Sequence, residues 1–233
     1  MKKNSNMRTT LLSHLAKLRS RQIWKMPLFL FIFLVLVFVV WLAGIFKRPA
    51  HFRTVQIIDD NEISQYLTNE ILPEFYNKSQ SGSEFEMTFS QEGINDILAR
   101  HIKELRINPD VFSDISITFK KGRILLAALT SWHSYKFIVT AVFKPSVNEE
   151  GLTAGLSKIQ TGTSTVPFAK EIIRRRVLYE LARSSRESDL VHYAGIVLND
   201  KLMPREFSFN HRDFRIKNIE VEDGKLIIGF VPK

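Results

Sequence analysis

The longest apolar stretch of the chain runs from Met26 to Phe46, where 21 consecutive residues carry no charge. A helix of that length, at about 1.5 Å per residue, crosses the roughly 30 Å hydrocarbon core of a bilayer. The stretch exceeds the apolar region of a signal peptide, about 7–15 residues, and lacks a small-residue cleavage site. We therefore expect an uncleaved transmembrane helix at 26–46, with Pro27 in its first turn, where a missing N–H is tolerated.

Beyond this stretch the spacing of apolar residues changes several times. A helical period over residues 61–76 predicts a first helix that ends near Pro73. Residues 85–89 alternate between apolar and polar and predict a strand. Ser90 follows as a helix cap, and a helical stripe over 91–105 predicts a second helix.

A period of two dominates the next part of the chain. Short alternating segments joined by turns between Ile115 and Gln160 predict an antiparallel sheet. A further helix is expected at 167–183, with Pro167 in its first turn. Strands at 214–221 and 226–231 flank Asp223-Gly224, a strong hairpin signal. The pattern predicts the α+β class: a transmembrane helix, then one domain of antiparallel sheet with packed helices.

Basic residues are concentrated at the N-terminus. The formal net charge is +9, but residues 1–25 hold seven lysines and arginines and no acid, so 26–233 has only +2. The positive-inside rule then predicts a cytoplasmic tail at 1–25, a span at 26–46, a juxtamembrane linker at 47–60 and an extracytoplasmic domain at 61–233. Because the excess positive charge belongs to the tail and not to the folded domain, we expect no nucleic-acid partner. The single apolar span predicts a single-pass protein of the cell membrane.

The sequence offers little for catalysis. The absence of cysteine excludes disulfides, thiolate metal sites and a cysteine nucleophile. Residues 211–218 match the spacing of a kinase catalytic loop, but its partner motifs are missing. We predict a protein that is not an enzyme and uses no metal or cofactor. A buried serine or aspartate beside His101, His133 or His192 in a cleft would favour a hydrolase instead.

Apolar residues lie on both faces of several strands, for example in Tyr135–Phe143. A sheet covered on both sides explains this pattern. The alternative interpretation is a groove or cavity for a hydrocarbon chain. The candidate wall residues of such a lipid site are Ile97, Phe119, Leu125, Phe137, Val139 and Phe143.

The helix predicted after Pro167 is strongly basic. Lys170, Arg174, Arg175 and Arg176 are candidates for binding a lipid phosphate. A solvated helix face, partly neutralised by neighbouring glutamates, is the alternative explanation.

Several segments together resemble the YpmS-like family of small membrane-anchored proteins of Gram-positive bacteria. They are Phe89–Asn95, Val142–Leu152, Gly162–Pro167 and Ile219–Leu226. The resemblance covers most of the chain from residue 27, and its motifs are structural, so it supplies no active-site residues. It implies an extracytoplasmic domain that binds lipid. The order of elements is also compatible with a curved sheet around a helix, as in tubular lipid-binding proteins.

We therefore expect a membrane-anchored extracytoplasmic protein of the cell envelope that binds a lipid or acyl chain, with membrane lipids as partners. The alternative is an anchored scaffold that recruits another envelope protein and has no small-molecule ligand. A lipid binder would have an elongated apolar pocket with a polar mouth. A scaffold would have a packed interior and a large exposed apolar patch.

Overall fold

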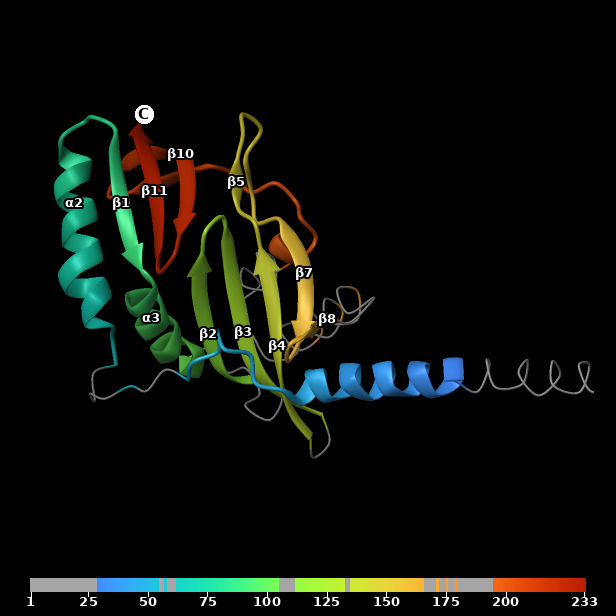
Figure 1. Cartoon of the computed structure of the whole chain (residues 1–233). Coiled ribbons are helices and arrows are strands. Elements are labelled where there is room, and N and C mark those ends of the chain that lie inside the picture. The colour runs from blue at the N-terminus through green and yellow to red at the C-terminus, as the bar shows by residue number, and fades with distance from the viewer. Residues whose placement is uncertain are drawn as a thin grey trace, which may run out of the picture. The chain divides into compact units, whose positions relative to one another are not determined.

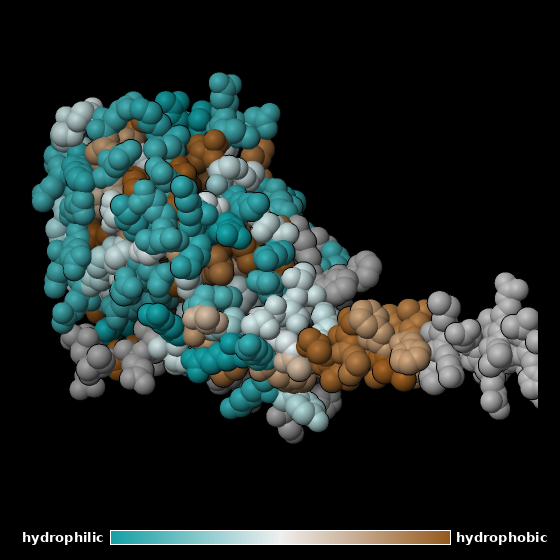
Figure 2. Space-filling view, in the orientation of Figure 1, coloured by the Kyte–Doolittle hydropathy of each residue, from teal (hydrophilic) through white to brown (hydrophobic). Residues whose placement is uncertain are grey.

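The computed structural model describes residues 29–54, 57, 62–104, 112–132, 135–165, 171, 175, 179 and 195–233 (Figure 1). The chain divides into two compact units, Met1–Gly44 and Ile45–Lys233. The first contains all but the last two residues of a helix, Phe29–Phe46, that is long and apolar enough to cross a membrane. Its residues lie at the hydrophobic end of the scale in Figure 2. The three residues predicted to begin this helix, 26–28, lie outside the described part of the chain.

The second unit mixes helices with antiparallel sheet, as the sequence predicted, but the strands form three sheets instead of the single sheet expected. One sheet has four strands in the order β1-β11-β10-β9. Its strands are β1 (Phe85–Ser90), β9 (Glu206–Phe209), β10 (Arg212–Glu222) and β11 (Lys225–Pro232). The predicted hairpin is confirmed: β10 and β11 pair in antiparallel register around Asp223-Gly224, and Gly224 has a φ of 80°. Residues 211–218, the kinase-like stretch, therefore belong to a turn and a strand.

The predicted end of the first helix near Pro73 is wrong. A π-helix, η1 (Tyr66–Ile71), leads directly into the α-helix α2 (Leu72–Gln80). Pro73 lies in the first turn of α2, directly after the π-helical segment, and the helical backbone continues through it to Gln80. The polar loop that follows is correspondingly shorter than expected.

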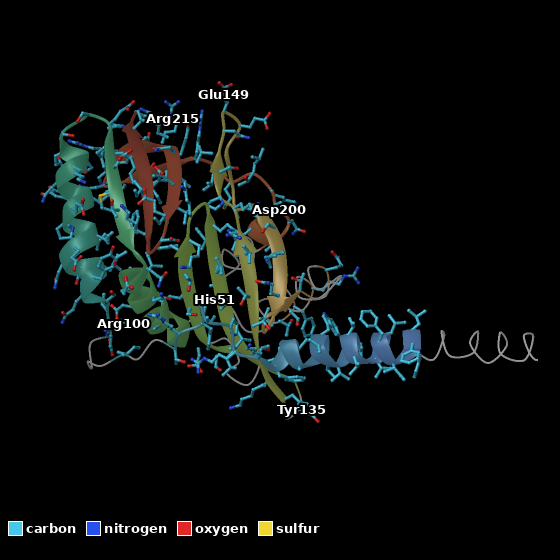
Figure 3. All side chains as sticks on the ribbon, in the orientation of Figure 1. His51, Arg100, Tyr135, Glu149, Asp200 and Arg215 are labelled. Atoms are coloured by element: carbon cyan, nitrogen blue, oxygen red, sulfur yellow. The ribbon has the colours of Figure 1, made fainter. Side chains whose placement is uncertain are left out.

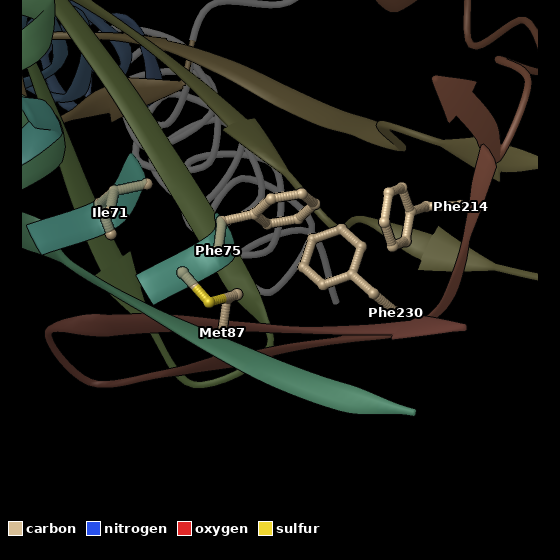
Figure 4. Close-up of a cluster of buried hydrophobic side chains, with 5 residues drawn as sticks. All are labelled: Ile71, Phe75, Met87, Phe214 and Phe230. Carbon is tan, nitrogen blue, oxygen red and sulfur yellow. The ribbon is translucent and has the colours of Figure 1, made fainter. Parts of the chain in front are cut away.

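Helix α2 covers one face of the four-stranded sheet. Its Phe75 packs against a buried cluster from three strands, drawn in Figure 4. The Phe75 ring makes edge-on contacts with Phe214 and Phe230 at centroid distances of 5.4 and 5.3 Å. Met87 and Phe214 are fully buried, so this cluster forms the core of the four-stranded half. Aromatic contacts of this geometry add stabilisation beyond their buried area.

The predicted strands between Ile115 and Gln160 form the second sheet, with five strands in the order β2-β3-β4-β7-β8. They are β2 (Phe112–Lys120), β3 (Arg123–Trp132), β4 (Tyr135–Phe143), β7 (Leu156–Thr161) and β8 (Ser164–Thr165). A third, two-stranded sheet pairs β5 (Ser146–Val147) with β6 (Leu152–Thr153). Every neighbouring pair in these sheets is antiparallel.

The five-stranded sheet is buried on both faces, as the distribution of apolar residues predicted. On one face Phe143, Leu156 and Ile159 pack with Leu198. On the other face Phe52 packs against Ala127 and Ile138. Phe52 is only 5% exposed although it lies in the predicted juxtamembrane linker. Phe52 is therefore part of the packed unit, unlike a residue of a free linker.

Candidate functional site: a groove beside strand β2

A half-open groove with a volume of about 650 Å³ lies beside strand β2. Its size falls within the range of ligand pockets, about 300–1,000 Å³. Five elements form its walls: the segment after the apolar helix, the start of α3 (Gln91–Glu104), the edge strand β2, its neighbour β3 and the β10–β11 turn. The lining residues are Ala50, His51, Arg53, Gln91, Glu92, Asn95, Ser116, Ile117, Thr118, Phe119, Lys120, Leu125 and Gly224.

Two side chains of α3 bind the free edge of β2. The Asn95 amide donates to the Ile117 carbonyl at 2.7 Å and accepts from the Ile117 N–H at 2.6 Å. One turn earlier, Gln91 Oε1 accepts from the Phe119 N–H at 2.9 Å. The Phe119 carbonyl accepts from Gly224 N–H at 3.2 Å. An open strand edge is prone to pairing with another chain, and here side chains and a turn satisfy it and fix α3 as a wall.

The residues that precede and begin α3 position it. The predicted cap is confirmed, because Ser90 Oγ accepts from the Gly93 N–H at 3.1 Å. The Tyr66 hydroxyl in turn accepts from the Ser90 N–H at 2.8 Å. A Cβ at position 93 would lie 2.2 Å from the Tyr66 ring, so only glycine allows this close approach.

His51 lies against the face of the five-stranded sheet that carries Thr118 and Thr140 (Figure 3). Its Nε2 hydrogen-bonds the Thr140 hydroxyl at 3.0 Å, and its backbone carbonyl accepts from the Thr118 hydroxyl at 2.9 Å. Thr140 is completely buried. Burial of the imidazole lowers the pKa of His51 below its ordinary value of 6.5, since desolvation disfavours the charged ring. His51 therefore lines the groove as a neutral hydrogen-bonding group.

Ser116 is the unusual residue of the groove. It is 3% exposed, and its Oγ has no hydrogen-bond partner. Among the buried side-chain oxygens and nitrogens of the described residues, this is the one atom left unpaired. The register explains this: Ser116 lies opposite Ala127, whose methyl group cannot bond, and Ala127 lies opposite Thr140. The Thr140 and Thr118 hydroxyls on this face are already bonded to His51. A buried hydroxyl without a partner is costly and calls for an explanation.

A bulge in β2 turns Ser116 towards this face. The register shifts between Ser113 and Ser116, and Asp114 within the shift has a φ of 47°. An extra residue in one strand reverses which face the following side chains occupy. Local sequence does not reveal such a bulge, because the alternation of Ile115, Ser116 and Ile117 is compatible with an uninterrupted strand.

Charged residues at the groove have a small excess of positive charge. Arg53 and Lys120 are the two cations among its lining residues, and Glu92 is the one acid. Asp223 lies 4.0 Å from Lys120, but both side chains are more than half exposed, so solvent screens the pair. The first turn of α3 contributes a positive partial charge from its backbone N–H groups.

The structure brings only some of the predicted lipid-wall residues together. Phe119 and Leu125 line the groove. Phe137 lines a smaller hollow of about 350 Å³. Val139 and Phe143 belong to the core cluster on the other face, and Ile97 is half-buried on α3.

Most of the predicted headgroup residues lie outside the described part of the chain, namely Lys170, Arg174 and Arg176. Arg175 is described, has a helical backbone and is exposed. It pairs with Glu171, four residues earlier on the helix, at 3.3 Å. This contact agrees with a solvated helix face and does not test lipid binding.

Of the three histidines named for a hydrolase, the structure describes only His101. His101 Nδ1 lies 3.1 Å from the Ile97 carbonyl of its own helix, and His133 and His192 are outside the described residues. Within the described ranges no group of three or more histidines and acids could hold a metal ion. The His51–Thr140 pair resembles a nucleophile and base, but Thr140 is completely buried in the centre of the sheet.

Sequence reasoning missed His51, Ser116, Gln91 and Asn95 as groove residues. The four-residue spacing of Gln91 and Asn95 was a usable signal, since it places both on one side of a helix. No such signal pointed to His51 and Ser116, because the residues that surround them belong to segments distant in sequence.

Fold and groove together define a class: an α+β domain of antiparallel sheets that follows an apolar helix able to span a membrane. Comparison with family models, with curated proteins and with solved structures finds no match to this chain. Membership of the YpmS-like family stays a prediction from the sequence motifs.

Proposed function

We propose that the chain is a single-pass membrane protein whose outer domain binds a membrane lipid in the groove beside β2. The observation that carries this proposal is that a wall of the groove follows the apolar helix directly in the sequence. The wall residue Ala50 follows Phe46, the last residue of the apolar helix, by four positions. Four residues reach at most about 14 Å, so the helix end holds this wall close to one membrane surface.

The lining of the groove supports a lipid more than a polar metabolite. Leu125 offers apolar surface on the sheet face that carries Thr118, and hydroxyl, amide and charged groups lie around it. An apolar pocket with a few polar groups is typical of ligand sites. Each buried methylene contributes about 0.8 kcal/mol, so even a short part of an acyl chain adds substantial affinity.

The test is to block the groove at its exposed rim. Ala50 is exposed, so Ala50→Trp fills space in the groove without disturbing the core. Native mass spectrometry of the full chain in a neutral detergent, after incubation with lipid vesicles, should detect bound lipid on the wild type. We expect Ala50→Trp to lose at least 80–90% of that bound lipid, roughly tenfold weaker binding.

Ser83→Trp is the matched control, since Ser83 is an exposed loop residue outside the groove. It should keep the wild-type lipid load. A wild type that carries no lipid, or an Ala50→Trp variant that carries as much as the wild type, would contradict the proposal.

The anchored scaffold is the second candidate, and one observation favours it. Leu72 and Tyr76 lie one turn apart on α2 and are 41% and 48% exposed. A lipid-free wild-type protein would make this apolar pair the next surface to study, with Leu72→Ser and Tyr76→Ser variants tested for loss of a protein partner.

A further inference from the structure

We infer that Ser116 is the hydrogen-bonding contact for the headgroup of the bound lipid, and that this headgroup is anionic. The inference rests on the proposed lipid function and deepens it by assigning the ligand's polar end. Ser116 lines the groove and is 97% buried, and within the described residues its Oγ has no partner. A hydroxyl both donates and accepts, so a phosphate or carboxylate oxygen satisfies it.

The surroundings of Ser116 select the ligand's polar group over its acyl chain. An acyl chain packed against Ser116 would leave its hydroxyl without a hydrogen bond, so the free-energy cost of burying that hydroxyl would remain. A polar group that bonds the hydroxyl removes this cost. The neighbouring hydroxyls of Thr118 and Thr140 do not compete for the ligand, because both are bonded to His51. Of the buried hydroxyls of Ser116, Thr118 and Thr140 on this face, that of Ser116 is therefore the one left for the ligand.

Charge favours an anionic headgroup. Arg53 and Lys120 line the same groove against the single acid Glu92, and the N-terminal turn of α3 adds a partial positive charge. His51 is neutral because burial lowers its pKa, so it adds no charge to this set. Asp223, 4.0 Å from Lys120, is 73% exposed and screened by solvent, so the lining residues keep a net positive charge that a negatively charged headgroup would balance.

The central experiment compares wild type and Ser116→Ala for binding of phosphatidylglycerol, with the full chain in a neutral detergent. A hydrogen bond to a charged group is worth about tenfold or more in affinity, so we expect Ser116→Ala to bind this lipid about tenfold more weakly. Diacylglycerol with the same acyl chains should bind the wild type more weakly than phosphatidylglycerol, and Ser116→Ala should not change its binding.

Thermal unfolding without added lipid provides a second readout that a merely structural serine would not give. Ser116→Ala removes a buried hydroxyl that lacks a hydrogen-bond partner. The variant should therefore have a higher midpoint temperature of unfolding than the wild type. Added phosphatidylglycerol should then raise the midpoint of the wild type more than that of the variant.

Ser79→Ala is the matched control. Ser79 is 2% exposed, lies on α2 outside the groove, and donates to the Tyr76 carbonyl at 2.7 Å. Its loss should lower the unfolding midpoint and leave phosphatidylglycerol binding unchanged.

Each contrary outcome has a distinct meaning. Equal phosphatidylglycerol affinity of wild type and Ser116→Ala, or a lower midpoint for the lipid-free variant, overturns the role of Ser116. Equal wild-type affinity for diacylglycerol and phosphatidylglycerol overturns the anionic headgroup but keeps lipid binding. Glycerol 3-phosphate bound as tightly as phosphatidylglycerol overturns the lipid as the source of the anion. Absence of binding for all three probes overturns the proposed function itself.

Discussion

At the scale of single residues, burial of polar groups decides the properties of the groove. His51, Thr118 and Thr140 satisfy one another, whereas Ser116 on the same face has no partner within the described residues. The arrangement leaves one hydroxyl free while the histidine is held neutral. Both features depend on the segment around His51 lying on the sheet.

The pH dependence of stability follows from His51. Its pKa in the folded protein lies below the ordinary 6.5 because burial disfavours the charged ring. Below pH of about 6.5 the unfolded chain therefore binds a proton more readily than the folded one, and acidification favours unfolding. The stability associated with neutral His51 is complete above about pH 6.5 and is lost as the pH falls through the lower folded pKa.

Urea unfolding at pH 7.5 and pH 5.5 measures this effect in wild type and His51→Gln. Glutamine can still hydrogen-bond Thr140 but does not titrate. We expect the wild type to lose more stability than His51→Gln over this interval. Equal losses would show that the titration of His51 does not contribute.

At the scale of elements, α3 acts as a cover for the edge of β2. Asn95 replaces a neighbouring strand by bonding both backbone groups of Ile117. Ser90 and Gly93 fix the start of the helix, so the segment Phe89–Asn95 is explained by the way it docks α3. The groove exists because this helix contacts the strand edge through side chains, which keeps the two backbones apart.

Asn95→Ala should destabilise the protein by about 2–3 kcal/mol, because it leaves the N–H and C=O of Ile117 unpaired. Chemical unfolding of the full chain in detergent, monitored by tryptophan fluorescence, measures the change. Asn77→Ala is the control, since Asn77 is exposed on α2 and its loss should change stability by no more than about 0.5 kcal/mol. Equal stability changes for the two variants would show that the clamp contributes nothing.

At the scale of the whole molecule, the function depends on which side of the membrane the second unit occupies. The apolar helix Phe29–Phe46 is long enough to span a bilayer. Seven basic residues and no acid in 1–25 predict a cytoplasmic N-terminus and an outward-facing C-terminal unit.

A reporter fused to Lys233 tests this orientation. We expect external protease to remove the reporter from intact cells, because the C-terminal unit faces outward. A cytoplasmic reporter in the same cells should stay intact as a control for lysis. A protected C-terminal reporter would reverse the topology and place the groove at the inner leaflet.

The sequence determined the elements whose signals are local. The apolar span, the cap at Ser90, the antiparallel strands and the Asp223-Gly224 hairpin were all predictable, since each depends on neighbouring residues and on periods of 3.6 or 2. The continuation of the first helix through Pro73 was not predicted, although proline in a first turn is permitted.

Tertiary structure decided the candidate site. Only the folded chain brings His51 onto Thr140, 89 positions away in sequence, and Asn95 onto Ile117, 22 positions away. A bulge that adds one residue to β2 turns Ser116 towards the face where Ala127 offers no partner. No local pattern encodes these pairings, because register and burial are set by the free energy of the whole packed unit.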